Sequence, residues 1–252
     1  MVHHENSERK VVAVVIEVRM TSTRLPGKHL LECNGEPMIT RLIRRIKAIE
    51  NVDKIIIATT KNSADDVFVD IAHKEAVEIF RGSEPDVMGR VLNAALVNKV
   101  DVICEVTGDC PLIDVTQTQE AIGIFLQNSF EYLNNALSGL PDGLGCQIFT
   151  TDALRSSYNS DITELDKEHV TSHMKRNPEM YLSHYTDTPP QLCWPELSLS
   201  LDEIADFEIL SSIISELEPQ DPLFGTSKII EFFNAHPELL EKNLEIYRRG
   251  YE

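Results

Sequence analysis

Three fixed cations, Arg19, Arg24 and Lys28, stand close together near the start of the chain, with hydroxyl residues such as Ser22 between them. Side chains of this kind bind phosphate oxygens, and the backbone N–H groups of a loop add further hydrogen bonds. The loop is therefore a candidate polyphosphate site; the alternative is a basic loop that only increases solubility. The chain holds 23 Lys and Arg against 41 Asp and Glu, a net charge of −18. A local cluster of cations is therefore unusual in this acidic chain, which favours the polyphosphate site over a merely solubilising loop. Further cations follow, some of them expected on a solvated helix face: Arg41, Arg44, Arg45 and Lys47.

Two carboxylates are candidates for holding Mg²⁺. Asp109 follows an apolar run and a glycine, and Asp202 ends the run 197–201, in which leucine and serine alternate. In nucleotide chemistry Mg²⁺ is usually bound by one or two carboxylates together with phosphate oxygens. The alternatives stay open: a turn or helix cap for Asp109, and the N-cap of the next helix for Asp202. If the two share an ion, their side-chain oxygens should lie within about 6 Å of each other and face the cation cluster.

The histidines are weaker candidates. His169 and His173 have i, i+4 spacing on a predicted helix, but no third ligand has a suitable spacing. We interpret both as mainly structural and keep His169 as a candidate for substrate contact. The chain lacks the G-x-G-x-x-G, G-x-x-x-x-G-K-[ST] and G-x-S-x-G motifs, which argues against ordinary NAD binding, P-loop hydrolysis and serine hydrolysis.

The first half of the chain alternates between strand and helix patterns. Strands are predicted over 11–18, 54–60, 77–80 and 101–106, and helices over about 37–49, 66–75, 86–99 and 115–128. This alternation predicts a parallel sheet, in which ligands gather outside the carboxyl ends of the strands. The loops that begin at Arg19, Thr59, Arg81 and Thr107 should therefore share one edge of the sheet.

The pattern is looser in the second half. A strand is predicted over 131–135, a turn over 140–145, a helix around 168–173, extended segments over 179–203 with a half-buried strand at 197–201, and helices toward the C-terminus. No repeat or linker interrupts the chain. We predict a single domain over 1–252, with a disordered leader at 1–10 and an insertion over about 130–195 that serves substrate binding or dimerisation.

Composition narrows the function classes. No apolar run approaches the roughly 20 residues that span a bilayer, and the polar start lacks the apolar core of a signal peptide. The five cysteines are scattered without a C-x-x-C pair, which favours reduced thiols in a cytoplasmic protein over disulfides or structural zinc. The acidic balance argues against a nucleic-acid partner.

Residues 19–28, RMTSTRLPGK, resemble the R-x-G-S-x-R-L-P-x-K signature of the cytidylyltransferases that activate acidic sugars. The most similar branch is that of the spore coat polysaccharide biosynthesis protein F, and wider relatives include the CMP-sialic acid and CMP-Kdo synthetases. The resemblance continues in order along the chain, at 80–90, 107–114, 141–143 and 168–171, and more weakly at 201–202 with 206–207.

The resemblance implies a fold and an activity. The fold is the α/β, Rossmann-like nucleotide-diphospho-sugar transferase fold, with a mixed, mostly parallel sheet flanked by helices and a small insertion subdomain. The activity is a Mg²⁺-dependent transfer of CMP from CTP to a small acidic sugar, with release of pyrophosphate. A homodimer without membrane or nucleic-acid partners is also implied.

The resemblance also implies roles for particular residues. Those matching the signature would hold the triphosphate and include the catalytic cations: Arg19, Ser22, Arg24 and Lys28. Asp109 and Asp202 would hold the metal, Asp109 beside the nucleotide. The remaining matches would contact the base, at Thr59 and Asn62, or face the sugar, at Arg81, Arg90 and His169.

Four positions depart from the family pattern. Thr21 replaces the glycine of the signature, and Glu17 stands where this branch usually has glutamine. Gly145 and Gln147 occupy places where acidic residues are expected. These departures favour a second hypothesis, a catalytically silent relative that binds a nucleotide or nucleotide-sugar and regulates a glycan pathway. For Thr21 we expect a side chain that faces the phosphates and narrows the pocket, rather than one that donates a hydroxyl hydrogen bond to them.

Overall fold

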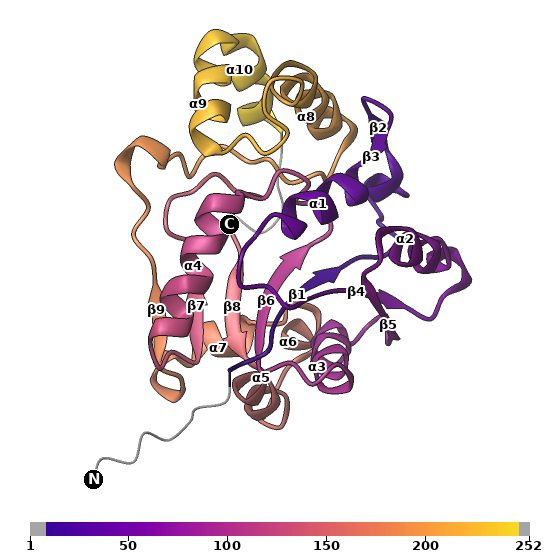
Figure 1. Ribbon diagram of the computed structural model, residues 1–252, viewed down its shortest axis with the longest axis vertical. Helices are drawn as coiled ribbons and strands as arrows, with labels where there is room; N and C mark the ends of the chain where they lie inside the picture. Colours follow the sequence, from indigo (N-terminus) through magenta and orange to yellow (C-terminus); the bar gives the residue numbers. More distant parts are fainter. Residues whose placement is uncertain (1–8, 247–252) are drawn as a thin grey trace.

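The computed structural model describes residues 9–246, so the predicted leader falls almost wholly outside the described residues (Figure 1). The described residues form a seven-stranded sheet with the strand order β5-β4-β1-β6-β8-β7-β9. Its strands are β1 (Val12–Glu17), β4 (Lys54–Thr60), β5 (Glu78–Gly82), β6 (Val102–Thr107), β7 (Tyr132–Asn134), β8 (Gln147–Thr150) and β9 (Ser183–Tyr185). A small hairpin of β2 (Glu32–Cys33) and β3 (Glu36–Pro37) stands apart from this sheet.

The sheet is mostly parallel. Strands β5, β4, β1 and β6 run in one direction, β8 is antiparallel to both β6 and β7, and β9 is parallel to β7. The carboxyl ends of the first four therefore meet at one edge, as predicted. The register there pairs Glu17 with Ala58 on one side and with Thr107 on the other.

Helices cover both faces of the sheet (Figure 1). Alternate residues of β1 point to opposite faces: Val14 and Ile16 pack with α1 (Met38–Lys47), α2 (Val67–Glu75) and α4 (Val115–Gln127). Ala13 and Val15 pack with α3 (Val87–Val97), α5 (Thr151–Tyr158) and α7 (Ser172–Arg176), near the short α6 (Glu164–Glu168). Because β1 is buried on both faces, its sequence is continuously apolar.

The C-terminal helices form a further layer beside α1 (Figure 1). They are α8 (Ile204–Leu217), α9 (Thr226–Ala235) and α10 (Pro237–Glu245), and they share an apolar cluster with Met38 and the leucines of 197–201. Within residues 9–246, no helix is long and apolar enough to cross a membrane.

Two predictions about the second half are wrong. The segment 197–201 is not a half-buried strand: it makes one isolated bridge, between Ser198 and Asp142, and its serines are buried like its leucines. His169 and His173 do not share a helix, because His169 ends α6 and His173 lies in α7. The His173 ring instead contacts the hydroxyl of Tyr181, with 3.0 Å between Nδ1 and the oxygen.

The predicted insertion over about 130–195 contributes β7, β8 and β9 to the main sheet, together with α5, α6 and α7. Strand β8 and helix α5 were not predicted. The role of this segment in substrate binding or dimerisation stays a prediction.

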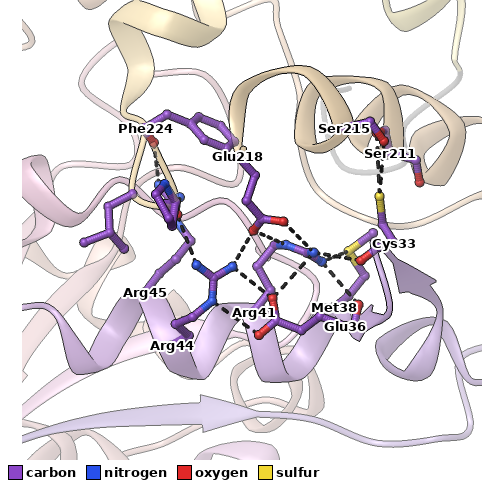
Figure 2. A network of polar contacts seen from close by, with 12 residues as sticks. Cys33, Glu36, Met38, Arg41, Arg44, Arg45, Ser211, Ser215, Glu218 and Phe224 are labelled. Atoms are coloured by element: carbon purple, nitrogen blue, oxygen red, sulfur yellow. Dashed lines mark hydrogen bonds and ion pairs between the residues drawn. The ribbon is translucent and has the colours of Figure 1, made fainter. Parts of the chain in front are cut away.

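Two of the cations on α1 are buried and do not belong to a basic surface. Arg45 donates from Nε to the Ile113 carbonyl at 2.9 Å and from Nη2 to the Phe224 carbonyl at 2.7 Å. Arg41 forms a bidentate pair with Glu218 just beyond α8, at 2.9 and 3.1 Å (Figure 2). These contacts attach the C-terminal layer to α1.

We expect Glu218→Ala to lower the free energy of unfolding by about 3 kcal/mol. The substitution removes the bidentate partner of the buried Arg41 guanidinium and leaves it the longer contact to the Glu36 carboxylate, at 3.5 Å. The Arg41 side chain is only 1% exposed. Urea denaturation measures the effect, with Glu216→Ala as the matched control. Glu216 is 47% exposed and its carboxylate lies 3.0 Å from Nε2 of His236, a surface contact, so the control should lose less than about 1 kcal/mol. Equal losses in the two variants would contradict this assignment.

Candidate active site

A cleft of about 520 Å³ opens at the carboxyl ends of β1 and β6. Its volume lies within the usual range for small-molecule sites. Among the residues that line it are eight that the sequence predicted: Arg19, Ser22, Arg24, Lys28, Arg90, Asp109, His169 and Asp202. The topology therefore brings the cation cluster and both candidate metal ligands to one place.

Lys28 joins the two carboxylates. Its Nζ donates to Asp109 Oδ2 at 2.7 Å and to Asp202 Oδ1 at 2.9 Å. The two oxygens can be no farther apart than the sum of these distances, which is below the ~6 Å expected of carboxylates that share an ion. This geometric prediction is confirmed. Arg24 adds a second cation, with its Nη2 2.8 Å from Asp202 Oδ1.

The charges in this group stabilise one another. Burial disfavours the charge of Lys28, but the carboxylates of Asp109 and Asp202 outweigh burial and raise the Lys28 pKa above its ordinary value. Burial also disfavours the charge of Asp109, yet the Lys28 ammonium lowers the pKa of Asp109 to about 2. Both groups are therefore charged at neutral pH.

The turn after β6 fixes Asp109. His29 follows Lys28, and its Nδ1 lies 3.0 Å from the Gly108 carbonyl. Burial lowers the pKa of His29 to about 4, so the neutral ring donates this hydrogen bond at pH 7. A Cβ on Gly108 would come within 3.0 Å of the Glu17 carbonyl and 3.1 Å of the His29 ring, which explains why glycine stands there.

The extended segment 197–201 delivers Asp202. It lies against Gly143, where φ is +85° and an added Cβ would come within 2.9 Å of the Leu199 backbone. The backbone N–H of Leu201 donates to the Asp109 carbonyl at 2.8 Å, which joins the two carboxylate-bearing segments directly.

The donor set fits Mg²⁺ bound together with a triphosphate. Within the described part of the chain, no group of three or more His, Cys, Asp and Glu side chains could hold a metal by itself. Asp109 and Asp202 supply two hard oxygen ligands, and Mg²⁺ normally completes such a set with phosphate oxygens and water. The metal role of these residues stays a prediction.

Comparison with known proteins gives the family. The family model described as cytidylyltransferase matches residues 13–208, well over half of the chain. The chain belongs to the cytidylyltransferase family. It is accordingly a nucleotidyltransferase, and the family predicted from the motifs is confirmed.

Individual relatives agree with this assignment. The spore coat polysaccharide biosynthesis protein SpsF of Bacillus subtilis is 26% identical over 242 residues, 90% of this chain and 95% of SpsF. A 3-deoxy-manno-octulosonate cytidylyltransferase of Bradyrhizobium sp. is 36% identical over 107 residues, 40% of this chain and 42% of that protein. The structure of a cytidylyltransferase from Leptospira borgpetersenii has a TM-score of 0.88 at 30% identity and covers 95% of this chain and 100% of its own.

Three predicted site residues of this cytidylyltransferase do not line the cleft. Thr59 is buried, and Asn62 donates to the Glu84 carboxylate at 2.6 Å. Arg81 is engaged beside them: its Nε donates to the Thr60 carbonyl at 2.8 Å and its Nη2 to the Asn62 carbonyl at 2.8 Å. These contacts hold the loop after β4, and roles toward base or sugar stay predictions for all three.

Other cleft residues were not predicted as site residues, among them Glu17, His29 and Glu168. His29 and Glu168 directly adjoin residues that were predicted. Glu17 carried a signal of its own, since an acidic side chain at the end of a buried strand needs an explanation.

The structure bears on two of the departures from the family pattern, Gly145 and Thr21. Gly145 cannot carry an acidic side chain, because an added Cβ would lie 2.5 Å from the Cα of Ala136. Thr21 is exposed and does not line the cleft; its hydroxyl donates to Glu84 Oε1 at 2.6 Å. The expectation that Thr21 faces the phosphates is therefore wrong, and its side chain instead ties the signature loop to the loop after β5.

We expect Thr21→Gly to weaken CTP binding about two- to fivefold, instead of tightening it. The substitution opens no space in the cleft, removes the hydrogen bond to Glu84 and makes the loop more flexible, an effect of roughly 0.5–1 kcal/mol. Calorimetric titration with CTP measures the affinity. Tighter binding would restore the narrowing hypothesis.

Proposed function

We propose that this cytidylyltransferase transfers CMP from CTP to a sugar acid, with Mg²⁺, and releases pyrophosphate. The observation that carries the proposal is the group of Lys28, Arg24, Asp109 and Asp202 in the lining of a cleft of about 520 Å³, a volume in the range of small-molecule sites. Cations alone would suit many anions. The paired carboxylates beside them suit a triphosphate that arrives with a divalent cation.

The residues of the cleft have separable tasks in this reaction. Lys28 and Arg24 spread the negative charge of the triphosphate. Arg19 and Ser22, on the same loop, add a further cation and a hydroxyl to the lining of the cleft. An oxygen of the acceptor attacks the α-phosphorus in line, and pyrophosphate leaves. Mg²⁺, when held by Asp109 and Asp202, would neutralise charge that develops on the phosphate oxygens.

The acceptor end of the cleft suits an acidic sugar. Arg90 and His169 also line the cleft, and Arg90 is buried with no hydrogen-bond partner for its Nε among the described residues. A guanidinium N–H in this state is a ready donor to a substrate carboxylate or hydroxyl. The name of the Bradyrhizobium relative points to the same substrate class.

We also propose a cytoplasmic homodimer that acts in polysaccharide biosynthesis, as the name of SpsF suggests. The segment 130–195 carries large apolar side chains that are 45–65% exposed, which is typical of an interface. They are Leu137, Leu165, Met180, Leu182 and Tyr185. Light scattering measures the mass, and a monomer at micromolar concentration would end the dimer proposal.

A panel of nucleoside triphosphates and acceptors tests the proposed activity. Each triphosphate is incubated with Mg²⁺ and with sugar acids or sugar phosphates, and pyrophosphate release is measured. We expect release only with CTP and a sugar acid. If the protein binds CTP but releases no pyrophosphate with any acceptor, the catalytically silent relative is favoured instead.

A further inference from the structure

Glu84 connects three loops beside the cleft. It lies in the loop between β5 and α3, and its carboxylate accepts two hydrogen bonds, each of 2.6 Å. Thr21 Oγ1, in the signature loop of residues 19–28, donates to Oε1, and Asn62 Nδ2, in the loop after β4, donates to Oε2. Arg19 Nη1 lies 3.7 Å from the same Oε1. One carboxylate therefore joins the loops that follow β1, β4 and β5.

The backbone of Glu84 is held by a residue of the cleft. Arg90 Nη1 donates to the Ser83 carbonyl at 2.5 Å and to the Glu84 carbonyl at 3.4 Å. Arg90 and Arg19 both line the cleft, whereas the described residues of the lining do not include Glu84. Glu84 is therefore fixed by one cation of the cleft through its backbone and contacts another through its carboxylate, without facing the substrate itself.

The Glu84 carboxylate is ionised at neutral pH. The hydrogen bonds from Thr21 and Asn62 lower the pKa of Glu84 below its ordinary value, and the charge of Arg19 lowers it further. An ionised carboxylate only accepts hydrogen bonds, and bonds to a charged group are stronger than those between neutral groups. The contacts therefore restrain Thr21 and Asn62 more firmly than a neutral partner would.

Thr21 gives this connection to the signature loop. The backbone N–H of the next residue before it, Met20, donates to Asp65 Oδ1 at 2.7 Å, so the loop is also held to the segment after β4. The family signature has glycine in place of Thr21, and glycine would offer Glu84 no hydroxyl and would leave the backbone more flexible. The residue by which this chain departs from the signature is thus the one that attaches the loop to Glu84.

We propose that Glu84 is a positioning residue for triphosphate binding, because it holds Arg19 and the signature loop in place before CTP arrives. This inference rests on the proposed function. A loop that is already ordered loses less conformational freedom on binding, which raises the affinity. The negative charge of Glu84 acts in the opposite direction, since it repels the triphosphate. The Glu84 side chain is 34% exposed, so water and salt screen this repulsion, and the ordering of the loop outweighs it.

Calorimetric titration of Glu84→Ala with CTP and Mg²⁺ tests the inference. We expect the affinity for CTP to fall roughly five- to twentyfold, more than in Thr21→Gly, because the hydrogen bonds from both Thr21 and Asn62 are lost. Glu84→Gln keeps an acceptor oxygen and should lose less. The KM for the acceptor should stay at the wild-type value in both variants, since Glu84 acts on the loop that holds the triphosphate.

Thr21→Val supplies a measurement that a general loss of structure would not reproduce. The substitution removes the hydroxyl and keeps the shape of the side chain. We expect it to weaken CTP binding in the wild type and to have no further effect in Glu84→Ala, because the two residues act through one contact. Glu78→Ala is the matched control: it removes an exposed glutamate at the other end of β5 and should leave the affinity unchanged.

A CTP affinity in Glu84→Ala that equals or exceeds that of the wild type would overturn the inference, and tighter binding would mean that repulsion is the larger effect. Independent, additive losses in Thr21→Val and Glu84→Ala would overturn it as well. A wild type that does not bind CTP is a different result, because the proposed function then fails and with it the ligand that Glu84 serves.

Discussion

Asp109→Asn and Asp202→Asn are each expected to lower Mg²⁺-dependent turnover by roughly 100-fold or more. Each substitution keeps the size of the side chain and removes one of the two carboxylates that Lys28 joins. If they hold the metal, the loss is several kcal/mol of charge stabilisation in the transition state, at about 1.4 kcal/mol per tenfold in rate. Initial rates of pyrophosphate release over a Mg²⁺ titration measure the effect.

The control for this pair is Asp152→Asn. Asp152 is 86% exposed and pairs with Arg155 on the surface, so its variant should match the wild type. The circular dichroism and thermal midpoint of all three variants should show an intact fold. Turnover and Mg²⁺ dependence that are unchanged in both cleft variants would remove the metal assignment.

The second large effect is expected for Lys28→Met. The substitution keeps the length of the side chain and removes the ammonium that contacts Asp109 and Asp202. The loss of a charge-assisted contact to phosphate weakens binding by about 1.5–3 kcal/mol, or roughly tenfold or more in affinity for CTP. The same titration with Arg24→Met should show a weaker loss, since that side chain is 34% exposed whereas Lys28 is 8% exposed. Unchanged CTP affinity in Lys28→Met would reduce the cluster to an internal ion pair.

Lys28→Met should also change how stability depends on pH. The pKa of Asp109 is about 2 in the folded protein, below the roughly 3.9 of an unfolded chain. Its ionised form therefore stabilises the fold above about pH 5, and this contribution is lost as the pH falls toward 2. Without the ammonium the folded pKa rises, so the variant should show less of this loss. Urea denaturation at several pH values measures the free energy of unfolding. If it falls equally with decreasing pH in the wild type and in Lys28→Met, the electrostatic assignment is contradicted.

The sheet and its functional edge follow from local sequence patterns. The run 11–18 is apolar throughout because β1 is buried on both faces, and the polar loops after β1, β4, β5 and β6 share an edge because those strands are parallel. The segment 197–201 misled because its alternation of leucine and serine normally marks one buried and one exposed face. Here both serines are buried as well, and burial of the Ser198 hydroxyl is possible because it donates a hydrogen bond to Asp142 at 2.8 Å.

The types of residue in the cleft could be predicted from the sequence, but the residues that each of them contacts could not. Fixed cations and a carboxylate after a buried strand indicate an anion site, yet nothing local reveals that Lys28 contacts residues 81 and 174 positions away. For the same reason the sequence did not show which of the cations at 41–47 are solvated: Arg41 and Arg45 are buried by the C-terminal layer, which lies far along the chain. Long-range packing decides which charges are free.

Following the α-phosphorus of CTP tests the account most directly. The protein is incubated with Mg²⁺, a panel of sugar acids and CTP labelled at that atom, and the products are separated by mass. We predict that the label appears in a CMP–sugar ester, with one pyrophosphate formed for each ester. Label that stays in CTP with every acceptor, although CTP is bound in the cleft, would contradict the account.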